Sequence, residues 1–243
     1  MEPWKLQPAG DLGLPPAEQW RSPRREGGLP TAIANHAWGT AVRGYLWAWH
    51  RFRIHGAGNL PREAPFVMVA NHTSHLDTLA LAAAIPWRLR SNAFPLAAGD
   101  TFFETAWSSA AAAGLLNALP VWRRRASGRA FHVLRERLVT GPCGYILFPE
   151  GTRSRDGRMG PFKGGVGMLV AGTEVPVIPC HLSGCFEALP PGHKRPRRGR
   201  IELRVGQAIR FADTANDKAG WESVARKLEE AVRGLQSRPA GLD

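Results

Sequence analysis

The 243-residue chain carries 32 lysines and arginines against 20 acidic residues, a formal net charge of +12, and 44% of its residues are hydrophobic. This length and composition fit one globular domain with a full core, and the basic surface should attract phosphate-bearing partners: nucleic acid, an anionic membrane or an anionic cofactor. The chain has three cysteines, Cys143, Cys180 and Cys185. This small and odd number does not suit a disulfide framework and favours a reducing compartment.

The first segment, residues 1–30, is rich in proline, glycine and charge and is predicted to form a poorly ordered leader. Its start lacks the basic residues and apolar run of a secretory signal, so no export is expected. The longest apolar stretch, residues 106–122, contains two serines, an asparagine and a proline. It falls short of the roughly 20 apolar residues of a spanning helix, and we predict no transmembrane segment.

Aromatic and basic side chains alternate in the next segment, residues 31–53, where a helix is predicted. The set comprises Trp38, Arg43, Tyr45, Trp47, Trp49, His50, Arg51, Phe52 and Arg53. Such interleaving suits an amphipathic helix in the headgroup layer of a membrane. A helix packed on the domain with its aromatic residues in the core fits the same pattern, because the spacing of apolar residues alone does not separate the two.

Strand and helix patterns alternate through the main domain, expected at residues 54–243. Short apolar runs predict strands at 51–56, 65–70, 93–98, 144–148, 175–182 and 200–205. Helix patterns cover 78–85, 102–117, 128–139, 164–171 and 221–235. This alternation indicates an α/β fold: a single domain with a central mixed β-sheet covered by helices on both faces, preceded by the aromatic helix.

A first polar cluster follows the strand predicted at 65–70, in the run Asn71-His72-Thr73-Ser74-His75-Leu76-Asp77. Sites in α/β sheets gather at the carboxyl ends of strands. His72 and Asp77 are five residues apart, so they meet only if the chain bends between the strand and the next helix. Ser74 as the N-cap, with Asp77 three residues later, provides that bend as a capping box. The capping box is also the purely structural interpretation of Asp77.

A second polar cluster follows the strand predicted at 144–148. Gly151 allows close backbone approach, Thr152 offers a hydroxyl, and Arg153 offers a fork of donors that matches phosphate oxygens. Glu150 is expected to hold that guanidinium in place. A salt-bridged turn is the alternative, but so many donors directly after a buried strand favour anion binding. Lys163, just before a predicted helix, adds a weaker phosphate-binding signal.

These two motifs resemble those of the glycerolipid acyltransferases, which include the 1-acylglycerol-3-phosphate acyltransferases. Family members carry N-H-x-S-x-x-D, here Asn71 to Asp77, and F-P-E-G-T-R, here Phe148 to Arg153, and both match without a gap. The resemblance covers about residues 50–210. It includes Asn59-Leu60-Pro61, Phe162-Lys163-Gly164-Gly165 and the block Val175 to Pro179, which in the family helps shape the acyl site.

One family block departs from the usual pattern. It usually reads like I-F-I-D-R, whereas residues 119–123 read Leu-Pro-Val-Trp-Arg. The chain keeps Arg123 but has Trp122 in place of the acidic residue. Because this block is thought to contact the glycerol phosphate, the departure bears on which acceptor is used.

The resemblance implies an O-acyltransferase that moves a fatty acyl group from acyl-CoA or acyl carrier protein to a lysophospholipid hydroxyl, most directly that of 1-acylglycerol-3-phosphate. Another lipid or a glycolipid hydroxyl is the alternative acceptor. No cofactor or metal is implied. Together with the basic surface and the aromatic segment, this implies a cytoplasmic enzyme peripherally associated with the inner face of an anionic membrane.

The same resemblance implies a role for each motif residue. His72 acts as general base, while Asp77 fixes its tautomer and stabilises its cation, so that no acyl-enzyme is required. Arg153, Lys163 and Arg123 hold the acceptor phosphate and position its hydroxyl. The remaining residues of the substrate-binding loop are Glu150, Gly151 and Thr152.

Other functions fit the sequence less well. A serine hydrolase would carry G-x-S-x-G, which does not occur. A zinc site drawn from Cys180, His181, Cys185 and His193 lacks the paired C-x-x-C order of such sites. The basic run at residues 194–200 could suggest a nucleic-acid-binding module, but it lies in a loop before a predicted strand and has no aromatic platform nearby. A solvated loop that faces anionic lipid is favoured, and no nucleic acid is expected as a partner.

Overall fold

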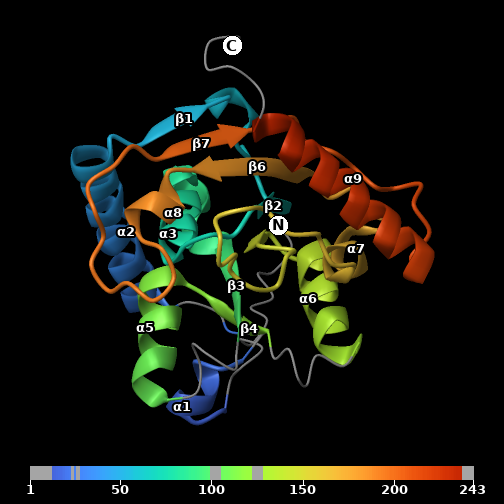
Figure 1. The fold of residues 1–243 in the computed structure, drawn as a ribbon. Helices are drawn as coiled ribbons and strands as arrows, with labels where there is room; N and C mark the ends of the chain where they lie inside the picture. The colour runs from blue at the N-terminus through green and yellow to red at the C-terminus, as the bar shows by residue number, and fades with distance from the viewer. Residues whose placement is uncertain (1–12, 23–24, 26–27, 99–104, 122–127, 237–243) are drawn as a thin grey trace.

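A mixed β-sheet runs through the centre of the molecule (Figure 1). The computed structural model describes residues 13–22, 25, 28–98, 105–121 and 128–236. Within them the strands are β1 (Arg53–His55), β2 (Phe66–Ala70), β3 (Ala93–Ala98), β4 (Leu119–Val121), β5 (Gly144–Leu147), β6 (Val177–Ser183) and β7 (Glu202–Val205). They lie in the order β1-β7-β6-β2-β5-β3-β4.

Strand direction decides where a site can form on this sheet. The strands from β6 through β2, β5 and β3 to β4 are parallel, whereas β7 is antiparallel to β6 and pairs in parallel with β1. The carboxyl ends of five strands therefore lie along one edge, the position at which α/β sheets build their sites.

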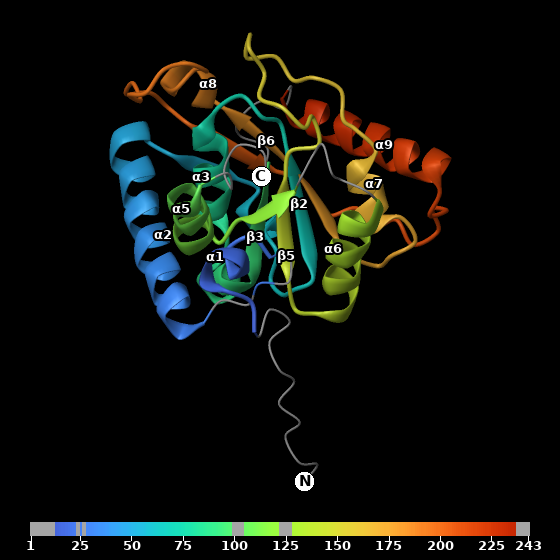
Figure 2. The same cartoon turned by 90° about the horizontal axis from the view of Figure 1, so that it is seen from below.

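Helices cover both faces of the sheet (Figure 2). One face carries α2 (Leu29–His50), α3 (His75–Ala84) and α5 (Ala106–Leu116), and the other carries α6 (Gly128–Thr140), α7 (Gly165–Val170) and α9 (Lys218–Gln236). The short elements are α1 (Pro16–Gln19), α8 (Cys185–Ala188) and the 3-10 helices η1 (Ala57–Asn59) and η2 (Trp87–Asn92). This arrangement confirms the predicted fold class.

The two-residue period of the strands explains the two covered faces. In β2, Phe66 and Met68 pack in the apolar cluster beneath α2 and α3, while Val67 and Val69 pack in the cluster beneath α6, α7 and α9. All five β2 residues are buried. A central strand buried on both faces is a continuous apolar run, which is the pattern its sequence shows.

The predicted elements correspond closely to the observed ones. Their ends agree within three residues, with one exception. The helix predicted at 102–117 is observed as α5 from Ala106 to Leu116, and the predicted start at residues 102–104 lies outside the described part. The short strand β4 was not predicted, since its central Pro120 removes a backbone donor and suits only an edge strand. Of the segment predicted as a leader, residues 1–12, 23–24 and 26–27 lie outside the described part, while α1 and the first residues of α2 fall within it.

The aromatic helix α2 packs on the domain but turns its aromatic residues outward. Val42 and Leu46 are buried against the sheet and α3, and Leu46 is fully covered. Trp47 is 73% exposed, and Trp38, Tyr45 and Trp49 are also exposed. The helix ends where Arg51 adopts a left-handed conformation with φ of 47°. The helix is thus packed on the domain, but the alternative that its aromatic residues lie in the core is wrong for these four side chains. Their place in a headgroup layer stays a prediction.

No helix in the described ranges is both long enough and apolar enough to cross a bilayer.

Candidate active site

The two polar motifs meet at the carboxyl edge of the sheet because they follow the adjacent parallel strands β2 and β5, in which Val69 pairs with Leu147. Two hydrogen bonds of the His72 backbone join the motifs directly. The N–H of Ser154 donates to the carbonyl oxygen of His72 at 2.8 Å, and the N–H of His72 donates to the Glu150 carboxylate at 2.7 Å. Two segments far apart in the sequence thereby form one site.

His72 and Asp77 form a hydrogen-bonded pair at this edge. His72 Nδ1 lies 3.0 Å from Asp77 Oδ2, and the Asp77 side chain is completely buried. The imidazole also stacks on the Phe148 ring, with centroids 4.0 Å apart and planes inclined by 14°. A carboxylate at Nδ1 keeps the proton on that nitrogen, which leaves Nε2 as the basic atom. No group in the described part of the chain hydrogen-bonds Nε2, and 17% of the side chain is exposed.

The bend that brings the pair together is the predicted capping box. Ser74 is the N-cap of α3, and its hydroxyl accepts the N–H of Leu76 at 3.2 Å. Asp77 Oδ2 accepts the N–H groups of Thr73 and Ser74 at 2.5 and 2.7 Å, besides the contact from His72. The Ser74 hydroxyl in turn donates to the carbonyl oxygen of Leu189 at 2.8 Å. The same carboxylate oxygen therefore both starts α3 and orients the imidazole.

Glu150 has different partners from those expected. Its carboxylate accepts the N–H of His72 at 2.7 Å through Oε1 and the N–H of Gly160 at 2.9 Å through Oε2. Burial raises the pKa of Glu150, while the N–H groups of Gly160 and His72 act in the opposite direction. The expected ion pair between Glu150 and Arg153 does not occur among the described residues. The Glu150 carboxylate instead links the His72 backbone to the loop that contains Gly160.

The cations of the second motif remain without acidic partners. Neither Arg153 nor Lys163 forms an ion pair within the residues that the structure describes. Gly151 has a left-handed φ of 75°, and a Cβ atom there would lie 3.0 Å from Lys163 Nζ, so the glycine leaves room for the ammonium group. The N–H of Lys163 donates to the carbonyl oxygen of Pro149 at 3.0 Å, and Thr152 beside this loop is exposed. An anion could bind in this place without displacing an existing salt bridge.

Arg123 lies outside the described residues. Strand β4 ends two residues earlier, at Val121, on the same carboxyl edge of the sheet as the two motifs.

Sequence reasoning missed two contacts that hold the site. The Asn71 amide pairs with the backbone of Leu182 in β6, accepting its N–H at 2.8 Å and donating to its carbonyl oxygen at 2.9 Å. Phe148 supplies the surface on which His72 stacks. Both residues are the first letters of their motifs, so their positions were visible in the sequence, but their partners lie on other segments of the chain.

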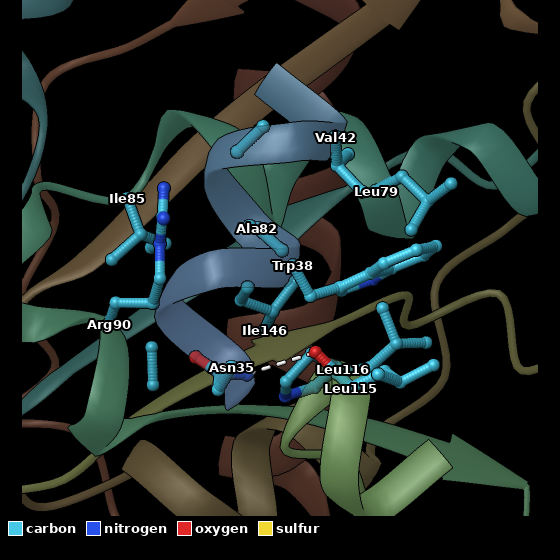
Figure 3. Close-up of a pocket in the computed structure, with 14 residues that line it drawn as sticks. Asn35, Trp38, Val42, Leu79, Ala82, Ile85, Arg90, Leu115, Leu116 and Ile146 are labelled. Atoms are coloured by element: carbon cyan, nitrogen blue, oxygen red, sulfur yellow. Dashed lines mark hydrogen bonds between the residues drawn. The ribbon is translucent and has the colours of Figure 1, made fainter. Parts of the chain in front are cut away.

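An apolar pocket lies between α2, α3 and α5 (Figure 3). Its wall includes Leu79 and Ala82 of α3, the helix that begins at the bend between His72 and Asp77, and Trp38 and Val42 of α2. The Asn35 amide closes one side by donating to the carbonyl oxygen of Leu115 at 3.0 Å. The block from Val175 to Pro179 does not line this pocket. Val175 and Val177 pack in the cluster beneath α6, α7 and α9, and Ile178 packs in the cluster beneath α2 and α3.

The residues considered for zinc are dispersed. Cys180 and Cys185 are buried in the cluster beneath α2 and α3, and His193 lies on an exposed loop. Across the described ranges, no group of three or more His, Cys, Asp or Glu side chains is arranged to hold a metal ion.

Comparison with known proteins finds similarity to one family. The family model described as Acyltransferase matches residues 51–183, more than half of the chain. The chain is 32% identical over 158 residues to 1-acyl-sn-glycerol-3-phosphate acyltransferase alpha from Bos taurus, which covers 64% of this chain and 53% of that protein. It is 32% identical over 152 residues to the chloroplastic 1-acyl-sn-glycerol-3-phosphate acyltransferase BAT2 from Brassica napus, covering 60% of this chain and 41% of that protein. The chain thus spans about half the length of the curated relatives it matches.

The fold also has a counterpart among solved structures. The crystal structure of the 1-acyl-sn-glycerophosphate (LPA) acyltransferase PlsC from Thermotoga maritima superposes with a TM-score of 0.63. The match covers 86% of this chain and 81% of that chain at 24% sequence identity. At 24% sequence identity, this similarity shows a shared fold alone.

Proposed function

The chain belongs to the acyltransferase family, and from this membership we propose that it transfers a fatty acyl group from a thioester donor to a lysophospholipid hydroxyl. Among acceptors of this class we propose 1-acylglycerol-3-phosphate, which the names of the two curated relatives specify for those proteins. The observation that carries the proposal is the 3.0 Å contact between His72 Nδ1 and the buried Asp77 carboxylate, on an imidazole that remains partly exposed.

The proposed reaction is a direct transfer. His72 Nε2 removes the proton of the acceptor hydroxyl as its oxygen attacks the thioester carbonyl carbon. The new C–O bond forms, the C–S bond breaks, and the departing thiolate takes the proton from the imidazolium. Asp77 stabilises that imidazolium through Nδ1. The products are an ester and a free thiol, and no group on the protein has to carry the acyl chain.

Two cations near the base support a phosphate-bearing acceptor. Arg153 and Lys163 follow the same strand end as Phe148, which stacks on His72, and no acidic side chain in the described residues neutralises them. Their proposed role is to hold the acceptor phosphate, so that its hydroxyl meets the imidazole. Arg123 is proposed as a third contact with the phosphate, with Gly151 and Thr152 completing the loop.

The donor and the cellular setting complete the proposal. The donor is acyl-CoA or acyl carrier protein, both of which present the acyl group as a thioester. A lysophospholipid acceptor resides in a membrane, and the formal charge of +12 favours an anionic one. We therefore place the protein in the cytoplasm, peripherally bound to the inner face of a membrane.

The test is an acyl-transfer assay with labelled acyl-CoA or acyl carrier protein and a panel of acceptors, read by which lipid gains label. His72→Ala should lower turnover by at least ~10²-fold, because it removes the general base. His75→Ala is the matched control, since it removes a neighbouring imidazole on the first turn of α3 and leaves the pair of His72 and Asp77 in place. Equal activity of wild type and His72→Ala would refute the proposed mechanism.

The acceptor panel tests the phosphate contact separately. Arg153→Ala should raise KM for 1-acylglycerol-3-phosphate while leaving KM for the donor close to the wild-type value, because the lost guanidinium binds only the acceptor. A neutral glycolipid acceptor provides the comparison. If the wild type uses the neutral acceptor better, the second candidate, transfer to another lipid or glycolipid hydroxyl, replaces the first.

A further inference from the structure

The Asp77 carboxylate accepts its N–H donors on one oxygen. Oδ2 accepts the backbone N–H groups of Thr73 and Ser74 and lies 3.0 Å from His72 Nδ1. Oδ1 is also buried, but no N–H or O–H group in the described ranges donates to it. Because the exposed fraction of this side chain is zero, water does not reach it, and its second oxygen needs a donor from the protein.

The chain around Cys185 is fastened to the first polar motif on both sides. Three residues before it, the amide of Asn71 pairs with both backbone groups of Leu182, at 2.8 and 2.9 Å. Four residues after it, the carbonyl oxygen of Leu189 accepts the Ser74 hydroxyl at 2.8 Å. Helix α8, which begins at this cysteine, therefore lies against the start of α3 (Figure 1).

The first turn of α8 buries the Cys185 thiol. Gly184 precedes it with a left-handed φ of 82°, and a Cβ atom there would collide with the carbonyl oxygen of Arg200. The N–H of Leu189 donates to the carbonyl oxygen of Cys185 at 2.9 Å and closes the turn. Cys185 is completely buried, in the apolar cluster beneath α2 and α3. Its thiol can therefore interact only with other groups of the protein.

The Cys185 thiol faces the Asp77 carboxylate. Burial raises the pKa of this thiol well above its ordinary value of 9.0, and the charge of Asp77, the hydrogen bond with Asp77 and then the charge of Glu187 act in the same direction. The thiol thus stays protonated and keeps its one S–H donor. Since three donors already surround Oδ2, the open position on this carboxylate is Oδ1.

We propose that Cys185 is a positioning residue for the base, because its S–H donates to Asp77 Oδ1 and fixes the orientation of the carboxylate. The donors at Oδ2 hold one oxygen in place, and a contact at the second oxygen fixes the plane of the group. Oδ2 then stays directed at His72 Nδ1, which keeps Nε2 directed at the acceptor hydroxyl. Cys185 touches no substrate and carries no acyl group. The inference rests on the proposed function only in taking His72 as the base.

Cys180 provides the matched control for this role. It is completely buried in the same apolar cluster as Cys185, so its replacement by alanine removes the same atom from the same kind of surroundings. Its sulfur lies 3.7 Å from the carbonyl oxygen of Ile178 on its own strand, and no interaction links it to Asp77 among the described residues. A comparison of the two cysteines therefore separates loss of the thiol contact from loss of packing.

The kinetic test uses the full chain and the acyl-transfer assay. Cys185→Ala should lower kcat by about fivefold, since one hydrogen bond corresponds to a factor of roughly 2 to 12, and should leave KM for donor and acceptor near the wild-type values. Cys185→Ser keeps a donor at this position and should restore kcat to within about twofold of the wild type. Cys180→Ala should stay within the same range. Circular dichroism and thermal unfolding show whether each variant is folded.

Two spectroscopic measurements require no catalysis. In protein with isotope-labelled histidine, the Nδ1–H resonance of His72, assigned by its absence from His72→Ala, should move upfield in Cys185→Ala because the bond to Asp77 loosens. It should stay in place in Cys180→Ala. The S–H stretching band of Cys185, isolated in the infrared difference between wild type and Cys185→Ser, should lie at lower frequency than the band of Cys180. The reason is that a carboxylate is a stronger acceptor than a backbone carbonyl oxygen.

Each contrary result has a distinct meaning. Unchanged kcat in Cys185→Ala, or equal loss of kcat in both alanine variants, would overturn the positioning role, the second by assigning the effect to packing. Failure of folded Cys185→Ser to regain turnover would overturn it too, because the donor would then not be the group that matters. An unmoved His72 resonance in Cys185→Ala, or an S–H band at the frequency of Cys180, would overturn it without any assay of transfer. Absence of acyl transfer in the wild type, with the spectroscopic differences intact, would overturn the proposed function and leave the contact between Cys185 and Asp77 standing.

Discussion

Substituting Glu150 by glutamine tests whether this residue holds the active-site backbone or the substrate. The carboxylate accepts two N–H groups, from His72 at 2.7 Å and from Gly160 at 2.9 Å. Glutamine offers one carbonyl oxygen and one NH₂ group, so it can accept only one of these donors. The second backbone N–H then faces another donor in a partly buried place.

The expected loss of stability in Glu150→Gln follows from these two hydrogen bonds. Losing one hydrogen bond to a charged acceptor costs about 1.5–3 kcal/mol, and leaving a buried N–H unsatisfied costs about 1–3 kcal/mol. Removing the charge offsets part of this cost, because burial disfavours the ionised carboxylate and raises its pKa. We expect the free energy of unfolding to fall by about 2–3 kcal/mol. Turnover should fall by at least ~10-fold, because the His72 backbone loses a positioning contact.

The assay combines urea unfolding with steady-state kinetics for both substrates. Glu174→Gln is the control, since it removes the same charge from a side chain that is 79% exposed, and its stability should stay near that of the wild type. If Glu150 instead held Arg153 for the substrate, the variant would keep its stability and raise only KM for the acceptor. That result would refute the backbone role inferred from the structure.

Four further changes test neighbouring contacts. Asn71→Ala should lower the free energy of unfolding in urea by about 2–4 kcal/mol, because the N–H and carbonyl of Leu182 lose their partner in a buried sheet. Ser74→Ala should cost about 0.5–2 kcal/mol through the helix cap and leave measurable turnover. Cys180→Ala should retain transfer, and labelled acyl-CoA alone should leave no hydroxylamine-sensitive label on the wild type, because direct transfer needs no acyl-enzyme. Burial, and to a lesser extent the charge of Arg204, lowers the pKa of His181 from 6.5 to about 4. Between pH 6.5 and about 4 the unfolded state therefore binds a proton that the folded state does not, so the free energy of unfolding decreases as the pH falls. His181→Gln should flatten that slope in thermal unfolding, and an unchanged slope would assign it to other groups.

The fold could be predicted from sequence because its signals are local. The run Phe66–Ala70 is apolar at every position, which indicates a strand covered on both faces. Helix α9 repeats buried residues at the helical period, among them Val224, Leu228 and Val232. In contrast, β4 has three residues and a central proline. The strand forms because it pairs with β3, and its own three residues do not indicate a strand.

The candidate site could be predicted only in part, because motifs identify residues but not their partners. The strand ends indicated that the two motifs are adjacent, and the structure places them in contact. The partner of Glu150 was predicted from proximity in sequence, where Arg153 is three residues away. The observed partners, His72 and Gly160, are backbone groups that only the completed sheet brings near. The same limit applies to the basic run at residues 194–200, where the expectation of no nearby aromatic platform is wrong. The Arg198 guanidinium lies over the Trp49 ring, although the two residues are far apart in the sequence.

Asp77 shows why a motif can support a structural and a functional interpretation at once. Considered as a capping residue, it accepts the backbone N–H groups of Thr73 and Ser74, and considered as a partner of the base, it accepts Nδ1 of His72. All three contacts converge on Oδ2, so the helix start is also the device that orients the imidazole. The backbone donors stabilise the charged carboxylate without requiring a second side chain. A substitution at Asp77 must therefore change helix stability and base orientation together. A conservative change at Ser74 affects mainly the helix cap, and comparing the two positions separates the contributions that the motif combines.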